Sequence, residues 1–107
     1  MIKVNVNSKE YEITMDGHAG YAEQGKDIVC AAASILLYTL ADTLKRFESI
    51  CDSDINIDDD NGKIKAVIKC TPKHSFEGNI QLVYQIILNG LQLLADGYPD
   101  NVKITFI

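Results

Sequence analysis

The sequence lacks several features that mark large classes of proteins. Its 107 residues include only seven glycines and two prolines, too few for a fibrous or low-complexity chain. No apolar run reaches the roughly 18 residues that a bilayer span needs. The first residues alternate apolar and polar side chains, which is not the layout of a signal peptide. We therefore expect a single domain over residues 1–107, located in the cytoplasm and without a membrane partner.

Positive charge is also sparse. Ten basic residues stand against fifteen acidic ones, and no basic cluster is longer than Lys45-Arg46. A surface for nucleic-acid phosphates is therefore not expected. The three cysteines are odd in number and far apart, at positions 30, 51 and 70, so they do not form a disulfide framework. In a reducing compartment each is a buried thiol, a ligand or a nucleophile.

Hydrophobic periodicity predicts an α+β domain. Strict alternation predicts strands, and the segments that show it are 2–7, 10–16, 55–58, 63–69 and 102–106. Helical periodicity runs from about 27 to 51 and from about 78 to 95. The order is β-β-α-β-β-α-β, which favours a mostly antiparallel sheet of about five strands with two packed helices. The first half of the first helix is apolar all round and should be buried on most sides, either centrally or in a subunit contact.

Metal and nucleotide binding find little support in the sequence. The acidic run at 58–62 ends in Asn61-Gly62, the strongest short signal for a hairpin turn. Neither register of this run places glycine and glutamate where a calcium loop needs them. Cys70 and His74 form a pair, but a structural zinc site needs four ligands. No glycine-rich nucleotide motif is present, and we predict neither a metal nor a cofactor.

The segment from residue 17 to residue 34 carries the most specific chemistry. His18 lies in a glycine-rich loop, and Cys30 follows in the first turn of the predicted helix. Backbone N–H groups and the positive end of the helix dipole favour a thiolate there, and a nearby histidine could take the proton. Asp27 could orient His18 or merely cap the helix. The alternative is that Cys30 is a core thiol and His18 a turn residue.

The same segment resembles a known signature. Its residues are Gly17-His18-Ala19-Gly20-Tyr21-Ala22, then 25–32, then Ser34, and they are similar to those of the ribosomal-processing cysteine protease (Prp) family. The resemblance implies a small α+β cysteine protease, commonly homodimeric, with His18 and Cys30 as the catalytic pair. It also implies that Asp27 is a supporting acid and that Ser34 lies on the substrate side. The implied activity is removal of a short N-terminal extension from a large-subunit ribosomal protein, which supports ribosome assembly.

The remaining expectations concern the substrate. Gly17, Gly20 and Gly25 should let a peptide backbone approach closely. Tyr21 either lines a specificity pocket or caps the core. Backbone N–H groups around Cys30 are the expected donors to an oxyanion. Two alternatives stay open: a phage-type protease that processes a capsid or scaffold protein, and a non-catalytic dimer of the same fold that binds a peptide.

Overall fold

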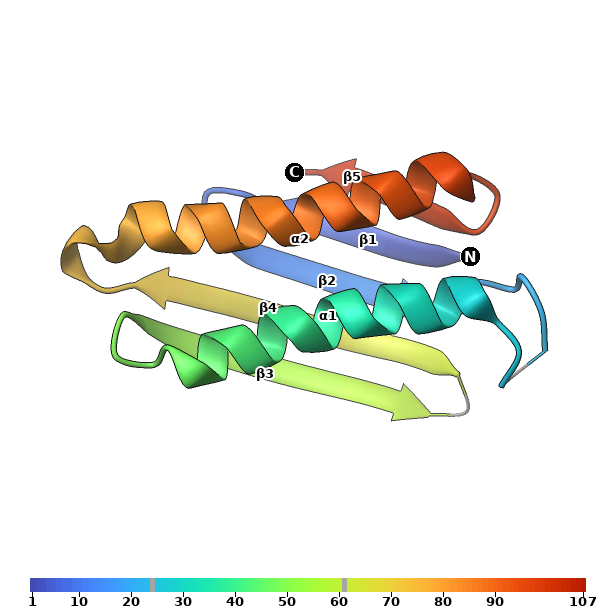
Figure 1. Ribbon diagram of the computed structural model, residues 1–107, viewed down its shortest axis with the longest axis horizontal. Coiled ribbons are helices and arrows are strands. Elements are labelled where there is room, and N and C mark those ends of the chain that lie inside the picture. The colour runs from blue at the N-terminus through green and yellow to red at the C-terminus, as the bar shows by residue number, and fades with distance from the viewer. Residues whose placement is uncertain (24, 61) are drawn as a thin grey trace.

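The computed structural model is a five-stranded sheet with two helices on one face (Figure 1). It describes residues 1–23, 25–60 and 62–107. The elements are β1 (Ile2–Asn7), β2 (Glu12–Gly17), α1 (Ile28–Arg46), β3 (Cys51–Asp60), β4 (Lys63–Pro72), a 3-10 turn (His74–Phe76), α2 (Glu77–Gly97) and β5 (Val102–Phe106). The predicted class and element order are confirmed.

The strands lie in the order β3-β4-β2-β1-β5. Every neighbouring pair is antiparallel except β1 and β5, which are parallel. A parallel partner needs a long crossover, and α2 provides it between β4 and β5. The backbone N–H of Ile2 also donates to the carbonyl of Asn101 over 2.8 Å. This contact holds the segment before β5 beside the start of β1, and hence near the end of β2.

The core lies between the sheet and the helix layer. Every second residue of β1 from Ile2 to Val6 is buried, as the alternation predicts. The helices contribute a stripe that includes Leu37 and Leu40 of α1 and Leu91 of α2. Each such side chain stabilises the fold by about 1.5–3 kcal/mol relative to an exposed one. The helices also approach closely, because a Cβ at Gly90 would lie 2.8 Å from the side chain of Leu36.

The first helix is shorter than its sequence pattern predicts. It ends at Arg46, and the N–H of Phe47 closes its last turn on the carbonyl of Thr43 over 3.2 Å. Cys51, predicted to end this helix, instead begins β3 and pairs with Pro72. Strand pairing with β4 therefore overrides the helical periodicity here. Tyr11, predicted within the second strand, has a φ of 48° and belongs to the turn before β2.

The outward surface of the helix layer is apolar too. Large exposed side chains stand on both helices, namely Ile28, Ile35, Tyr38, Leu82, Ile86 and Leu93. By length and composition alone, helix α1 could cross a membrane: its mean hydropathy is 1.5. One third of its apolar stretch is buried inside the chain. The prediction that its first half is buried on most sides is therefore wrong within one copy. A contact with another subunit is the expectation that stays.

Candidate active site

The loop between β2 and α1 begins at a position where only glycine fits. Gly17 has a φ of 111°, a backbone conformation that L-residues rarely adopt. A Cβ there would also collide with the backbone oxygen of Met1. His18 follows directly and is exposed. The required glycine therefore turns the chain sharply at the end of β2 and places the exposed imidazole at the start of the loop.

The segment before β5 holds the first half of this loop. The side-chain amide of Asn101 donates to the carbonyl of Ala19 over 2.8 Å, and Ala19 itself is buried. The ring of Tyr21 meets that of Tyr98 edge to face, with 5.3 Å between the centroids. Tyr21 thus packs against an aromatic neighbour at the surface and does not line the cavity described below.

Asp27 joins the second half of the loop to the first turn of α1. One carboxylate oxygen accepts from the N–H of Cys30 over 2.9 Å. The other accepts from the N–H groups of Tyr21 and Ala22, over 3.0 and 3.3 Å. Burial alone would raise the pKa of Asp27, but these backbone hydrogen bonds outweigh it and lower the pKa below its usual value. Asp27 therefore caps the helix and holds the loop against its first turn. No hydrogen bond links Asp27 to His18 among the described residues.

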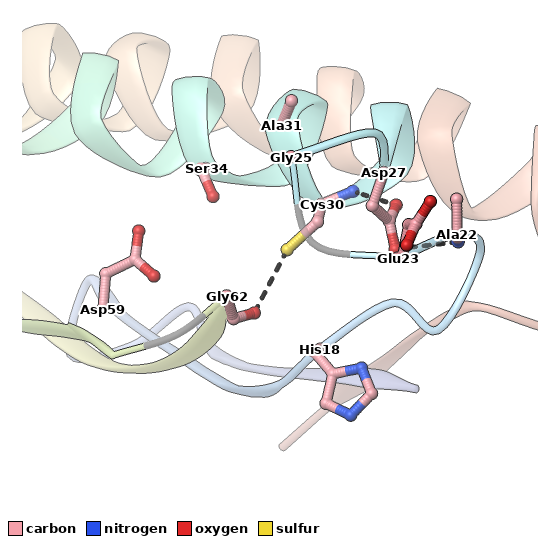
Figure 2. A pocket seen from close by; sticks show the side chains of 10 residues that line it. All are labelled: His18, Ala22, Glu23, Gly25, Asp27, Cys30, Ala31, Ser34, Asp59 and Gly62. Atoms are coloured by element: carbon pink, nitrogen blue, oxygen red, sulfur yellow. Dashed lines mark hydrogen bonds between the residues drawn. The ribbon is translucent and has the colours of Figure 1, made fainter.

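Cys30 lies in the first turn of α1, as predicted, and is half-buried. Its thiol donates to the carbonyl of Gly62 over 3.3 Å, at the start of the β4 side of the β3–β4 turn. Gly62 has a φ of 78°, which suits the predicted hairpin turn; Asn61 of that turn lies outside the described residues. Figure 2 shows His18 apart from Cys30 and Gly62, with its ring turned away from the sulfur. In this conformation the two predicted catalytic side chains share a cavity but do not touch.

That cavity has a volume of about 440 Å³ and opens beside α1 (Figure 2). Five of the sequence-predicted site residues line it: His18, Gly25, Asp27, Cys30 and Ser34. Gly17, Gly20 and Tyr21 are not among its lining residues. Five further lining residues were not predicted from the sequence, namely Ala22, Glu23, Ala31, Asp59 and Gly62.

The expected oxyanion donors are occupied. The N–H of Cys30 is held by the Asp27 carboxylate, and the N–H of Ala31 donates to the backbone carbonyl of Asp27 over 3.1 Å. Neither of these two N–H groups is free in this conformation, and their role as oxyanion donors stays a prediction. The capping carboxylate of Asp27 satisfies the N–H of Cys30, and the first backbone bond of the helix satisfies that of Ala31.

The second cysteine–histidine pair has a different environment. Cys51 and Cys70 are free, buried thiols. Burial and the neighbouring Cys51 raise the pKa of Cys70 to about 12. His74 is exposed at the start of the 3-10 turn. Within residues 1–23, 25–60 and 62–107, no group of three or more His, Cys, Asp or Glu side chains is placed to hold a metal ion.

A half-buried thiol in the first turn of a helix, open to a cavity that a histidine also lines, defines a small α+β thiol hydrolase. Residues 1–103 match the family described as cysteine protease Prp. The chain is 34% identical over 105 residues to the ribosomal processing cysteine protease Prp of Staphylococcus aureus, covering 98% of this chain and 94% of the relative. It therefore belongs to the Prp family and is a cysteine protease.

Two solved structures share the fold. Both are crystal structures of an essential ribosomal processing protease Prp from S. aureus, and each match covers 100% of both chains. The complex with a covalently linked product peptide has a TM-score of 0.83 at 31% identity. The complex with a substrate peptide has a TM-score of 0.76 at 30% identity. The family resemblance drawn from residues 17–34 is thus confirmed over the whole chain.

Proposed function

We propose that this chain is a cytoplasmic endopeptidase that removes a short N-terminal extension from a large-subunit ribosomal protein and so supports ribosome assembly. One observation carries the proposal: Cys30, in the first turn of α1, opens into the cavity that His18 lines. The relatives support it, because they are named for ribosomal processing and one holds a covalently linked product peptide.

In the proposed mechanism Cys30 is the nucleophile and His18 the general base. His18 takes the thiol proton, and the sulfur attacks the peptide carbonyl carbon to form a tetrahedral oxyanion. The oxyanion collapses to a thioester as the C–N bond breaks, and His18 gives its proton to the leaving amine. Water then hydrolyses the thioester, releases the acid product and restores the thiol.

Two rearrangements precede this attack. The Cys30 thiol must leave the Gly62 carbonyl, to which it donates over 3.3 Å. The His18 ring must also turn toward the sulfur, since it points away from it here (Figure 2). Asp27 acts as a positioning residue for both, because its carboxylate ties the loop to the first turn of α1. Substrate binding supplies the energy that separates the thiol from Gly62 and turns the ring.

The test uses the host's ribosomal protein with its extension attached. The purified wild-type chain should make a single cut at the junction, read by intact mass. Cys30→Ala should make none, and Cys51→Ser should cut as the wild type does because Cys51 is buried at the far end of α1. Absence of a cut together with an alkylatable Cys30 would point to a phage capsid or scaffold substrate. Absence of both would favour a peptide-binding module.

We further propose that the chain works as a homodimer through the outer surface of its helix layer. That surface carries exposed Leu82, Ile86 and Leu93 on α2 and Ile35 on α1, whereas the opposite face of the sheet is mostly polar. Light scattering should show a dimer. Ile86→Lys should shift it to monomer, and Val67→Lys, an exposed apolar position on the other face, should not. A wild-type monomer would overturn the proposal.

A further inference from the structure

The backbone of His18 is held by the sheet on its N-terminal side. Gly17, directly before it, is the last residue of β2 and pairs with Ile2 of β1 and with Ile64 of β4. A residue paired on both sides belongs to the most stable part of a sheet. The exposed imidazole of His18 therefore projects from a chain whose preceding residue is fixed.

Asn101 supplies a fixed point on the other side of His18. Its side-chain amide donates to the carbonyl of Ala19 over 2.8 Å, although the two residues are 82 positions apart in the chain. Ala19 is 2% exposed, whereas His18 and Gly20 on either side of it are exposed. A buried carbonyl needs a hydrogen-bond partner, and here that partner comes from a side chain outside the loop. The histidine thus lies between two anchored residues.

Asn101 is itself held at both of its backbone polar groups. Its N–H donates to the carbonyl of Tyr98 over 3.0 Å, and its carbonyl accepts from the N–H of Ile2 over 2.8 Å. The side chain is half-buried. Tyr98 of the same turn packs edge to face against Tyr21 of the loop. The turn between α2 and β5 is therefore a rigid support for the first half of the loop.

Cys30 is positioned by a different residue. Asp27 accepts from the N–H of Cys30 and from the N–H of Ala22, as Figure 2 shows, and so holds the second half of the loop to α1. The proposed base and the nucleophile thus have separate supports, one from the α2–β5 turn and one from the start of α1. Asn101 is not among the described residues that line the cavity. It can therefore act on the reaction only through the loop.

We propose that Asn101 is a positioning residue for His18. By fixing the carbonyl of Ala19 it keeps the histidine backbone in place, so that the group that turns toward the Cys30 sulfur is the ring and not the loop. The inference rests on the proposed peptidase function, in which His18 is the general base. It adds a residue from the other end of the chain to the machinery of that reaction.

The expected effect lies in kcat rather than in KM. A reacting group misplaced by about 1 Å can lower a rate about a hundredfold. Loss of one of two fixed points loosens the His18 backbone without releasing it, so we expect Asn101→Ala to lower kcat about tenfold. KM should change less than about twofold, because the substrate cavity itself is unaltered.

The experiment combines kinetics with backbone dynamics in the full chain. Cleavage of the ribosomal precursor gives kcat and KM, and amide order parameters from ¹⁵N relaxation report the backbone of His18 and Ala19. In the wild type these should resemble ordered strands, at about 0.85, and in Asn101→Ala they should fall below about 0.6. Asn101→Asp keeps the shape of the side chain, but a carboxylate cannot donate. It should lower kcat at least as much as Asn101→Ala.

Two control variants isolate the role of the amide. Asp100→Ala changes the same turn at an exposed side chain with no hydrogen bond or ion pair within the described parts of the chain, and it should leave kcat unchanged. Val102→Ala removes part of a buried side chain next to Asn101. It should lower Tm and leave kcat unchanged well below Tm, which separates a general loss of stability from a loss of position.

The outcomes separate the two proposals. The role of Asn101 is overturned if Asn101→Asp cuts as the wild type does, if order falls while kcat stays, or if Val102→Ala lowers kcat as much as Asn101→Ala. In each of these cases the peptidase function stands. If the wild type does not cut the precursor, the ribosomal-processing proposal fails. The order parameters then decide whether Asn101 holds the His18 backbone: a fall confined to His18 and its loop neighbours supports it, and unchanged values overturn it.

Discussion

Helix α1 has a cysteine near each of its ends, and the two surroundings differ in electrostatic sign. Cys30 lies in the first turn, at the positive end of the helix dipole. Cys51 lies just beyond the last turn, and its thiol donates to the carbonyl oxygens of Leu44 and Phe47 over 3.9 and 3.6 Å. Cys30 thus stands where the helix presents backbone N–H groups, and Cys51 where it presents backbone carbonyl oxygens.

Access differs in the same direction. Cys30 is half-buried beside an open cavity. Cys51 is 1% exposed and Cys70 2% exposed, and both contribute to the core. Each end of the molecule also has an exposed histidine, His18 or His74. A cysteine and a histidine near one another are therefore not enough for a catalytic site; the direction of the helix and a path for substrate decide which pair can react.

Alkylation should show the largest difference between the two ends. The pKa of Cys70 is raised from a usual 9.0 to about 12. This lowers its thiolate fraction roughly a thousandfold in mildly alkaline buffer, and burial blocks the reagent as well. Iodoacetamide followed by peptide mapping should therefore modify Cys30 in the native protein and leave Cys70 unmodified. Denaturant should make all three cysteines react, and native labelling of Cys70 at the rate of free cysteine would contradict this account.

The histidines offer a second test of the same contrast. His18→Ala should lower kcat/KM for the ribosomal precursor about a hundredfold or more, because it removes the proposed base. His74→Ala should change it by less than about twofold, as expected for a surface substitution far from the site. Both side chains are exposed, so circular dichroism should show that both variants fold. Equal losses in the two variants would mean that the site includes the far end of the molecule.

Local features of the site could be predicted from sequence because their causes are local. The N-cap role of Asp27 follows from its position three residues before Cys30, which is the spacing of a capping hydrogen bond. The period change after residue 27 indicates where the helix begins. The glycines also predicted a loop after the second strand, and Gly17 at its start has a positive φ, which glycine adopts readily.

The rest of the site depends on pairing between distant segments. The contact of Cys30 with Gly62 spans 32 residues and requires the full ten-residue register of β3 and β4. Periodicity predicted only residues 55–58 of β3, so the predicted series of side chains facing the helices ended before Asp59. Extending the alternation of Ile55 and Ile57 by one step would have placed Asp59 on the helix side.

Substitutions of Asp27 show how much the cap at the N-terminal end of α1 contributes to the stability of the fold. Asp27→Ala removes the cap and should lower the free energy of unfolding by about 1 kcal/mol, or about 5 °C in Tm. The pKa of Asp27 is lower in the folded chain than its usual 3.8. Its charge therefore stabilises the fold fully above that pH, and this contribution is lost as the pH falls through the folded-state pKa. Asp27→Asn keeps a capping side chain but should lose this pH dependence; thermal melts at several pH values would show it.

The smallest expected change in stability comes from backbone strain at His74, at the end of the molecule opposite the cavity. His74 has a φ of 45°, a left-handed conformation that costs an L-residue about 1 kcal/mol. Glycine relieves that strain but adds freedom to the unfolded chain, so His74→Gly should raise the free energy of unfolding by only about 0.5 kcal/mol. Gly17→Ala, at the reactive end, should instead destabilise, because its Cβ meets the backbone oxygen of Met1. Urea unfolding measures both, and a loss of stability in His74→Gly would show that its imidazole holds a contact that outweighs the strain.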